Sequence, residues 1–251
     1  MKILGIDIGG SGIKGALVDT ETGELVKERI RIKTPQPSKP KAVISTILEL
    51  VDRFEYGGPL GVGFPAVILD GIVMSAANVD HTWINYPGVE RISKAIGHPV
   101  TLVNDADAAG IAEKTFGAGR DRMGVVMVLT LGTGIGSALF VDGRLVPNTE
   151  LGHLYLRNRK MDAEDYASDR IRMQKKLTWK VWAGRLDVYL HHIERLFSPN
   201  LIILGGGVSK KYNDFIPRLT VRAEVVPAEL LNEAGIVGAA MACREELGLA
   251  N

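Results

Sequence analysis

The sequence is poor in cysteine, in net charge and in long apolar segments. Its 251 residues include one cysteine, Cys243, which excludes an intramolecular disulfide and a cysteine-rich metal site. The formal net charge of +1 argues against a nucleic-acid-binding protein with a strongly basic surface. No apolar run of about 18 residues is present to span a membrane. The opening segment MKILGIDIGG reaches acidic and glycine residues too early for a signal peptide. These absences predict a cytoplasmic globular protein of one or two domains, without a nucleic-acid or membrane partner.

Glycine is the residue in excess. The chain contains 29 glycines, about 12% of its residues against roughly 7% in an average protein. Many of them fall into four clusters, at residues 9–12, 132–136, 205–207 and 235–238. The first three follow apolar, strand-like segments, whereas the fourth lies in a helical pattern and is most simply explained by close helix packing. The first three clusters are therefore the candidates for function.

Apolar patterning predicts an α/β protein. Seven segments have the apolar run or alternation of strands: 3–8, 16–18, 24–32, 60–64, 100–103, 201–204 and the start of the segment 127–136, which runs into glycines. Three segments have the apolar spacing of helices: 41–54, 179–197 and 235–247. The chain thus opens as a three-stranded meander and continues with alternating helices and strands.

A weak internal repeat relates the two halves of the chain. A shift of 123 residues places Gly9 on Gly132, Val18 on Val141 and Asp19 on Asp142. The repeat predicts two similar α/β lobes with a cleft between them, and chance similarity of two glycine-rich hairpins is the alternative. We expect a smaller N-terminal lobe of residues 1–103 plus 236–251 and a larger lobe of residues 104–235.

The first glycine turn has the residue types of a phosphate site. Gly9, Gly10, Ser11 and Gly12 join two strand-like segments, and a turn of this kind exposes backbone N–H groups to an anion. Asp7 could hold magnesium, directly or through water, and Lys14 offers a positive charge. The alternative is a tight hairpin with a surface lysine.

Two further turns repeat this chemistry. Gly132, Thr133 and Gly134 occupy the corresponding place in the second half of the chain, so both turns could hold one polyphosphate chain. Gly205, Gly206 and Gly207 follow the apolar segment 201–204, and Ser209 is the expected N-cap of a helix after them. A junction of strand, glycines and helix suits an anion or a nucleoside.

Two polar pairs are candidates for substrate contact. Asn104 and Asp105 stand just past a predicted strand, where a carboxylate can accept a proton from a hydroxyl group. Helix capping by Asp105 or Asp107 is the alternative. Glu150 and His153 could bind adjacent sugar hydroxyls, although a lone histidine is more often structural.

Taken together, these motifs resemble the ROK (repressor, open reading frame, kinase) sugar kinases of the hexokinase–actin superfamily. The matching segments stand in the family's order over nearly the whole chain: residues 7–11, 104–105, 132–134, 150–153 and 205–207. Within that family the chain most closely resembles the polyphosphate glucokinases, at residues 34–37, 76–80, 147–150 and 226–228. The resemblance implies a two-lobed, actin-like (ribonuclease H-like) α/β fold with a central cleft.

The resemblance also implies an activity and a set of site residues. It implies phosphoryl transfer to the 6-hydroxyl of glucose, with Asp105 as the general base and magnesium near Asp7. The residues implied to hold the sugar are Asn78, Asn104, Asp105, Glu150, His153 and Glu164. Those implied to hold the phosphates or a nucleotide are Asp7, Gly9, Gly10, Ser11, Gly12, Lys14, Gly132, Thr133, Gly134, Gly206 and Gly207. A homodimer is expected by resemblance only.

One departure from the family concerns zinc. Many members carry a cysteine-rich zinc run just before the glutamate that corresponds to Glu164. Residues 157–163 fill that place here without a cysteine, so zinc is not expected. The polyphosphate glucokinases also lack these cysteines, and the departure therefore agrees with the narrower resemblance.

The phosphoryl donor is the open question at this stage. Residues 170–185 contain six basic residues and no acid, and Arg157, Arg159 and Lys160 precede them. This stretch is either a solvated helix face or a basic track for a polyanion, whose binding would weaken with salt. An ATP-dependent glucokinase and a dual-donor glucomannokinase are the alternatives to a polyphosphate-dependent enzyme. A repressor is disfavoured because the first strand begins at Ile3, and a filament or an inactive sugar sensor is disfavoured by the sugar motif and Asp105.

Overall fold

The computed structural model describes residues 1–156 and 159–249, which form two compact units. Unit 1 comprises Met1–Ala112 together with Glu233–Asn251, and unit 2 comprises Glu113–Asn232. The division falls inside helix α3 (Asp105–Thr115). Residues 104–112 and 233–235, assigned to the second lobe from the sequence, therefore group with unit 1. Within the described residues no helix combines the length and the apolar character needed to cross a membrane.

Unit 1 is built on a five-stranded sheet with the order β3-β2-β1-β4-β7. Its strands are β1 (Lys2–Gly9), β2 (Gly12–Asp19), β3 (Ile30–Ile32), β4 (Leu60–Phe64) and β7 (Val100–Asn104). β1, β2 and β3 are antiparallel neighbours, whereas β1, β4 and β7 run parallel. The other elements are α1 (Pro40–Arg53), β5 (Ile68–Leu69), β6 (Ile72–Val73), the 3-10 turn η1 (His81–Trp83), α2 (Gly88–Ile96) and α7 (Ala234–Glu246).

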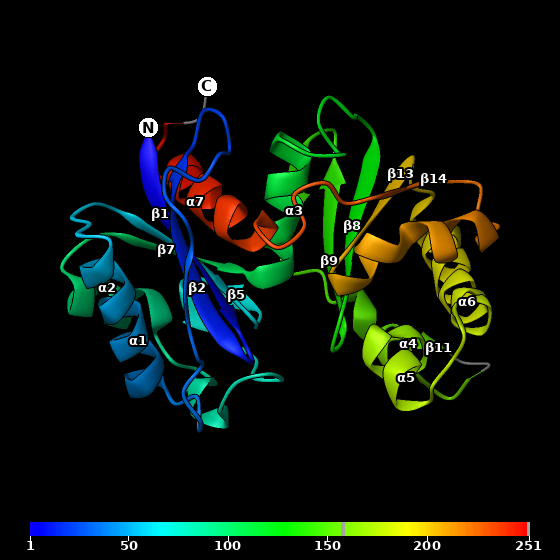
Figure 1. Ribbon diagram of the computed structural model, residues 1–251, viewed down its shortest axis with the longest axis horizontal. Coiled ribbons are helices and arrows are strands. Elements are labelled where there is room, and N and C mark those ends of the chain that lie inside the picture. Colours follow the sequence, from blue (N-terminus) through cyan, green and yellow to red (C-terminus); the bar gives the residue numbers. More distant parts are fainter. Residues whose placement is uncertain (157–158, 250–251) are drawn as a thin grey trace. The chain divides into compact units, whose positions relative to one another are not determined.

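Helices cover both faces of this sheet (Figure 1). Side chains along a strand alternate between faces. Ile6 therefore packs with Leu50 of α1 in one apolar core, while the neighbouring Gly5 faces α7. The same alternation leaves the odd-numbered positions of β1, including Asp7, on the α7 side.

Glycine allows α7 to pack directly on the sheet and on α3. A Cβ atom added to Gly5 would overlap the carbonyl oxygen of Ile236, and one added to Gly61 would overlap that of Ala239. A Cβ atom on Gly238, within α7, would overlap the carbonyl oxygen of Ala108. The packing role expected for the fourth glycine cluster is therefore confirmed.

Unit 2 repeats the sheet plan with the order β10-β9-β8-β13-β14. Its strands are β8 (Val125–Leu131), β9 (Ile135–Val141), β10 (Arg144–Val146), β13 (Leu201–Gly205) and β14 (Glu224–Pro227). The remaining elements are η2 (Leu151–His153), β11 (Tyr155–Leu156), β12 (Met161–Asp162), α4 (Ala163–Ala167), α5 (Asp169–Gln174), α6 (Trp179–Phe197), η3 (Gly207–Asp214) and η4 (Ile216–Arg218). The apolar core of the unit joins β8, β13 and α6 around Trp182 and Phe215.

The two sheets share strand order and strand directions. β8 and β9 are antiparallel, and β8, β13 and β14 run parallel, as β1 and β2 and β1, β4 and β7 do in unit 1. The shift of 123 residues also takes the first residues of β1 and β2 onto the first residues of β8 and β9. This agreement supports the predicted repeat over chance similarity of two hairpins.

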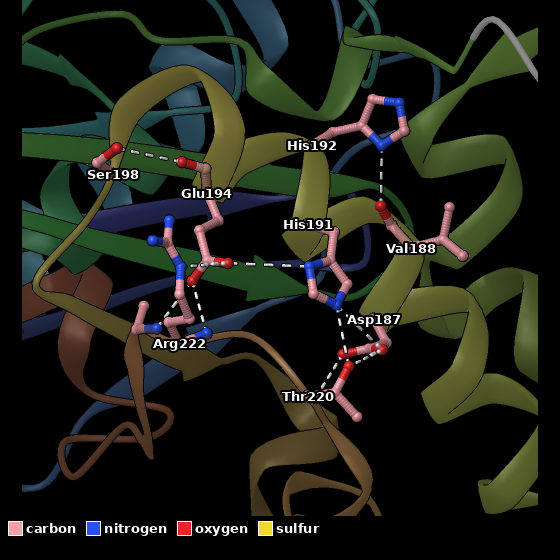
Figure 2. A network of polar contacts seen from close by, with 9 residues as sticks. Asp187, Val188, His191, His192, Glu194, Ser198, Thr220 and Arg222 are labelled. Atoms are coloured by element: carbon pink, nitrogen blue, oxygen red, sulfur yellow. Dashed lines mark hydrogen bonds and ion pairs between the residues drawn. The ribbon is translucent and has the colours of Figure 1, made fainter.

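Three side chains on one face of α6 hold the segment that leads into β14 (Figure 2). The Asp187 carboxylate accepts hydrogen bonds from the backbone N–H of Thr220 at 2.7 Å and from its hydroxyl at 2.8 Å. The Glu194 carboxylate accepts from the N–H groups of Arg222 at 2.6 Å and Ala223 at 2.9 Å. Burial raises the pKa of Glu194, but these hydrogen bonds, together with the hydrogen bond and charge of the Arg222 side chain, outweigh burial and leave the pKa below its ordinary value. His191 lies between the two carboxylates, with Nε2 2.9 Å from the Thr220 hydroxyl.

The strand expected over residues 24–32 is the clearest difference from the sequence prediction. Only Ile30–Ile32 forms a strand, and Leu25 makes an isolated bridge to Val18. The side chains of residues 26–29 are all exposed. The segment therefore has no apolar face to bury, and alternation alone does not keep it in the sheet.

Replacing Gly238 with alanine tests the close approach of α7. We expect Gly238→Ala to lower the free energy of unfolding by about 1–3 kcal/mol, because the new methyl group overlaps a backbone oxygen. Gly184→Ala is the matched control, since Gly184 lies in α6 with open space around it. The control should gain about 0.5–1 kcal/mol from helix propensity. Urea unfolding measures both, and an undiminished stability of Gly238→Ala would contradict the packing described here.

Candidate functional site

The candidate residues of unit 1 gather at one edge of its sheet. β1, β4 and β7 run parallel, so their carboxyl ends lie at the same edge. In this register Asp7 pairs with Gly63, and Gly63 pairs with Val103, the residue before Asn104. Asp7 and the Asn104–Asp105 pair therefore stand two strands apart. Asn78 is exposed in the loop between β6 and η1.

Side chains hold the first glycine turn by its carbonyl groups. The Thr34 hydroxyl donates to the carbonyl of Gly9, Gln36 Nε2 donates to that of Gly10 at 3.4 Å, and Arg31 Nη2 donates to that of Ser11 at 2.9 Å. In a trans peptide the C=O and the following N–H point in opposite directions. Anchoring the carbonyls of Gly9 and Gly10 thus directs the N–H groups of Gly10 and Ser11 away from these side chains.

Asp7 is held between a cation and a helix terminus. Lys14 Nζ lies 2.9 Å from Asp7 Oδ2, and both side chains are largely buried. Gly235, in the first turn of α7, approaches so closely that an added Cβ would lie 3.0 Å from Asp7 Cγ. The positive end of a helix stabilises a carboxylate. Lys14 is thus a partner of Asp7 rather than a free surface lysine.

Asn104 provides the cap of α3, where the sequence offered Asp105 or Asp107. Its Oδ1 accepts from the N–H groups of Ala106 at 2.9 Å and Asp107 at 3.1 Å, and its Nδ2 donates to the carbonyl of Ala66 at 3.1 Å. Asn104 is buried, with 6% of the residue exposed. Asp105 also accepts from Ala106 N–H, at 2.8 Å through Oδ1, and remains partly exposed at the end of β7. A rigid cap therefore fixes the backbone that carries Asp105.

The glycines of unit 2 also meet at one sheet edge. β8 and β13 are parallel neighbours, with Gly205 opposite Thr130. The turn of Gly132, Thr133 and Gly134 follows β8, and Gly206 and Gly207 follow β13. Gly206 has a left-handed φ of 84° and packs on Leu131 so closely that a Cβ would overlap its backbone. The two glycine clusters are thus adjacent.

Ser209 does not cap a helix, contrary to the sequence prediction. Its hydroxyl donates to the carbonyl of Gly206 at 2.8 Å instead of accepting from an N–H group. The left-handed φ of Gly206 turns the chain directly into the 3-10 segment η3, which begins at Gly207. Ser209 therefore lies inside η3, where its hydroxyl bonds back to the preceding turn.

The fold accounts for some of these glycines but not for others. Side chains at Gly12, Gly134 and Gly206 would collide with Arg31, Glu164 and Leu131 respectively. Gly10, Gly132 and Gly207, in contrast, have open space where a Cβ would stand and no left-handed φ. Among the described glycines Gly184 shares both properties, on the exposed face of α6. The missing side chains at the three turn positions leave room for something to approach the backbone.

Three of the predicted sugar residues come together beside the turn of unit 2. Glu164 Oε2 accepts from the N–H of Ile135 at 3.3 Å, and His153 Nδ1 lies 3.3 Å from Asp162 Oδ2. Partial desolvation raises the pKa of Glu150, the charge of Glu164 raises it further, and His153 opposes the shift. These interactions place Glu150, His153 and Glu164 within electrostatic reach of one another.

The basic stretch divides into engaged arginines and exposed lysines. Arg172 donates from Nε to Asp169 at 2.7 Å and stacks on Trp179, and Arg185 donates to the carbonyl of Tyr166 at 3.3 Å. Lys175, Lys176 and Lys180 are exposed. Arg157, counted in the stretch from the sequence, lies outside the described residues.

The described residues offer no metal site built from three or more protein side chains. Across residues 1–156 and 159–249 no group of three or more His, Cys, Asp or Glu side chains is arranged to hold a metal ion. Magnesium commonly takes one or two carboxylates and completes its shell with water and substrate phosphates. Asp7 at the glycine turn fits that pattern, whereas a site made of protein ligands alone does not.

The residues that bond the carbonyl groups of the two turns carry no assigned site role in the sequence motifs. Thr34 and Arg31 act across strands, and Arg170 donates from Nε to the carbonyl of Thr133 at 2.8 Å. Arg170 was assigned only to the basic stretch. Its partner is a backbone atom 37 residues away, so no local pattern in the sequence signals it.

Comparison with known proteins agrees with this architecture. A model of the ROK family matches residues 3–168. A polyphosphate glucokinase of Mycobacterium tuberculosis is 48% identical over 95% of this chain and 89% of its own length. The crystal structure of an inorganic polyphosphate/ATP-glucomannokinase from Arthrobacter sp. strain KM superposes with a TM-score of 0.93 and 47% identity, over 98% of this chain and 99% of the other.

A ROK family glucokinase from Streptomyces griseus, solved with glucose and AMPPNP, shares the fold with a TM-score of 0.84 and 24% identity, over 98% of this chain and all of the other. The match of the family model and the similarity along nearly the whole chain agree with the motifs at both sheet edges. The chain belongs to the ROK family and has the actin-like α/β fold of its sugar kinases.

Proposed function

We propose that this chain transfers the terminal phosphoryl group of inorganic polyphosphate to the 6-hydroxyl of glucose. The observation that carries the proposal is the sheet edge of unit 1, where the Asp105 carboxylate and the open glycine turn at Gly10 both lie. Transfer to a hydroxyl group needs a carboxylate to orient the acceptor and backbone N–H groups to hold phosphate. The 48% identity to a polyphosphate glucokinase supports the same donor and acceptor.

Asp105 is the general base of this proposal. It orients the 6-hydroxyl and accepts its proton, and strong basicity is not needed because the proton leaves late in a loose transition state. The side chains that hold the sugar are those of Asn78, Asn104, Glu150, His153 and Glu164. Asn104 also acts indirectly, because its hydrogen bonds to Ala106 and Asp107 fix the backbone at Asp105.

The glycine turns hold the donor phosphates. Gly10, Gly132 and Gly207 give the clearance, and the other residues of the set shape the turns or add charge: Asp7, Gly9, Ser11, Gly12, Lys14, Thr133, Gly134 and Gly206. N–H groups already oriented for the anion stabilise the leaving phosphate without reorganisation. Magnesium, when bound near Asp7, supplies further neutralisation of phosphate charge. Lys14 is included among the phosphate-binding residues because its ammonium group lies beside Asp7 and neutralises the carboxylate charge there.

Polyphosphate is the favoured donor, and use of ATP is the second candidate. The Arthrobacter relative is named for both donors and for mannose as well as glucose, which favours a dual-donor glucomannokinase as the alternative. The exposed lysines Lys175, Lys176 and Lys180 add positive charge that a long polyanion can use. We further propose that the protein is a cytoplasmic homodimer that does not bind zinc. This part of the proposal rests on the family resemblance.

One assay tests the activity. Purified protein is incubated with glucose, magnesium and either polyphosphate or ATP, and glucose 6-phosphate is measured. We expect product with polyphosphate, at a rate that falls as salt is raised. Absence of product with both donors would refute the kinase assignment, and product with ATP alone would replace the donor.

Replacing the general base gives a quantitative prediction. We expect Asp105→Asn to lower kcat by about 10²–10⁴-fold, the usual contribution of a positioned acid–base group. Asparagine retains an oxygen for the N–H of Ala106, so the unfolding temperature should stay near that of the wild type. A loss of less than tenfold in a folded variant would remove Asp105 from this role.

The open glycines give a second prediction. Gly132→Ala should leave stability nearly unchanged, because neither φ nor a neighbour opposes the methyl group. It should raise the KM for the donor about tenfold or more, the loss expected when one hydrogen bond to a charged group is blocked. Gly184→Ala, with equally open surroundings, should leave the donor KM unchanged and gain only the stability expected from helix propensity. Equal donor KM values in the two variants would place the phosphates elsewhere.

The raised pKa of Glu150 gives a pH dependence. Ionised Glu150 accepts hydrogen bonds from sugar hydroxyls, and its affinity for glucose is present above the raised pKa and lost as pH falls through it. The loss should therefore begin above the ordinary glutamate pKa of about 4.3. Calorimetric titration of glucose against pH measures it, with circular dichroism as a check on folding. Glu150→Gln should bind glucose weakly at all pH values. If the glucose affinity of that variant fell at acidic pH as it does in the wild type, the titration would belong to another group.

A further inference from the structure

One arginine holds two successive carbonyl groups of the turn in unit 2. The backbone N–H of Arg170 donates to the carbonyl of Gly132 at 3.0 Å, and its Nε donates to the carbonyl of Thr133 at 2.8 Å. Arg170 lies in the first turn of α5, which is separated from α4 by Ser168 alone. Two successive peptide groups of the turn are thus bonded to a single residue on one side.

This arrangement fixes the direction of the two following N–H groups. The N–H groups of Thr133 and Gly134 belong to the same peptide planes as the carbonyls of Gly132 and Thr133, and point away from them. Within the part of the chain that the structure describes, neither N–H group donates to a protein acceptor. Successive N–H groups facing one way form a concave site for an anion.

The guanidinium of Arg170 is itself held in place. Its Nη2 donates to Asp165 Oδ1 at 2.9 Å, and Asp165 belongs to α4. The planar fork of arginine allows it to bond Thr133 and Asp165 together, which the single ammonium of lysine cannot reproduce. On the other strand of the turn Glu164 bonds the N–H of Ile135 at 3.3 Å. The turn is therefore held at two places: Arg170 of α5 bonds its carbonyl groups, and Glu164 of α4 bonds the first residue of β9.

We infer that Arg170 is a positioning residue for the phosphoryl donor, which it serves by holding the N–H groups of Thr133 and Gly134 toward the phosphates. The inference rests on the proposed function and assigns a residue that the family motifs do not include. It differs from a role in general charge attraction, for which any exposed cation of residues 170–185 would serve.

Arg172 supplies a matched control for the experiment. It stands two residues away on α5, carries the same charge, and engages Asp169 at 2.7 Å and the Trp179 ring at 4.0 Å, without a bond to the turn. Arg170→Met, Arg170→Lys and Arg172→Met are compared with the full wild-type chain. The measurements are kcat, the KM values for polyphosphate and glucose, and the calorimetric Kd for tripolyphosphate.

We expect Arg170→Met to raise the donor KM and the tripolyphosphate Kd about tenfold or more, the loss expected for one charge-assisted hydrogen bond. The KM for glucose should stay unchanged. Arg170→Lys should recover only part of the loss, and Arg172→Met should change donor binding less than about twofold. Equal losses in Arg170→Met and Arg172→Met would overturn the inference in favour of general charge.

Asp165→Ala separates the two explanations by sign. Removing an acid makes the site more positive, so charge attraction alone predicts tighter donor binding. Positioning predicts weaker binding, because alanine has no oxygen to accept from Arg170 Nη2 and Arg170 loses its second anchor. Tighter binding of tripolyphosphate by Asp165→Ala would overturn the inference.

A readout without catalysis keeps the inference apart from the proposed function. The ¹⁵N order parameters of Thr133 and Gly134 report how rigidly their N–H groups are held. The value for Gly134 should fall in Arg170→Met and not in Arg172→Met, even if the wild type produced no glucose 6-phosphate. Thr133 serves as an internal reference, because the backbone N–H of residue 170 still holds the Gly132 carbonyl in Arg170→Met. An unchanged order parameter of Gly134 in Arg170→Met would overturn the positioning role, whereas an inactive wild type would refute only the kinase assignment.

Discussion

The site depends on hydrogen bonds to the carbonyl side of two glycine turns. Thr34, Gln36 and Arg31 hold the first turn, and Arg170 holds the second. Because a peptide group is planar, fixing its carbonyl also fixes its N–H. An exposed loop of glycines would otherwise sample many conformations, and ordering it at the moment of binding costs free energy. The protein meets that cost during folding, so the N–H groups are already oriented when a phosphate arrives.

Clearance and rigidity are divided among different glycines. Gly12, Gly134 and Gly206 let protein groups approach the backbone and so stiffen the turns, whereas Gly10, Gly132 and Gly207 keep space open. The two kinds look identical in the sequence. Only the neighbours of each position show which glycine serves packing and which leaves room for a ligand. The glycine excess of the chain is thus the sum of several requirements, the packing of α7 among them.

Local sequence signals predicted the parts of the structure that neighbouring residues decide. The strand and turn at residues 2–12, helix α6 and the repeat at residues 125–141 follow from apolar spacing and glycine position, and the structure has them. The prediction of a strand over residues 24–29 is wrong because an alternating pattern does not by itself supply an apolar face that becomes buried. The prediction of an N-cap at Ser209 is wrong because the left-handed φ of Gly206 decides how η3 begins. That φ accompanies the close packing of Gly206 on Leu131, which local sequence does not show. Arg170 and Thr34 were missed since each bonds a backbone atom far away in the sequence.

Helix α7 has a consequence for the order in which the chain can fold. It comes after the whole of unit 2 in the sequence, yet it covers one face of the unit 1 sheet and fits against Gly5, Gly61 and Ala108. Domains generally fold as units while the ribosome is still adding residues. Unit 2, an uninterrupted segment, is complete once Asn232 has emerged. Unit 1 must wait with an uncovered sheet face until α7 follows, so the half of the protein that is synthesised first becomes native last.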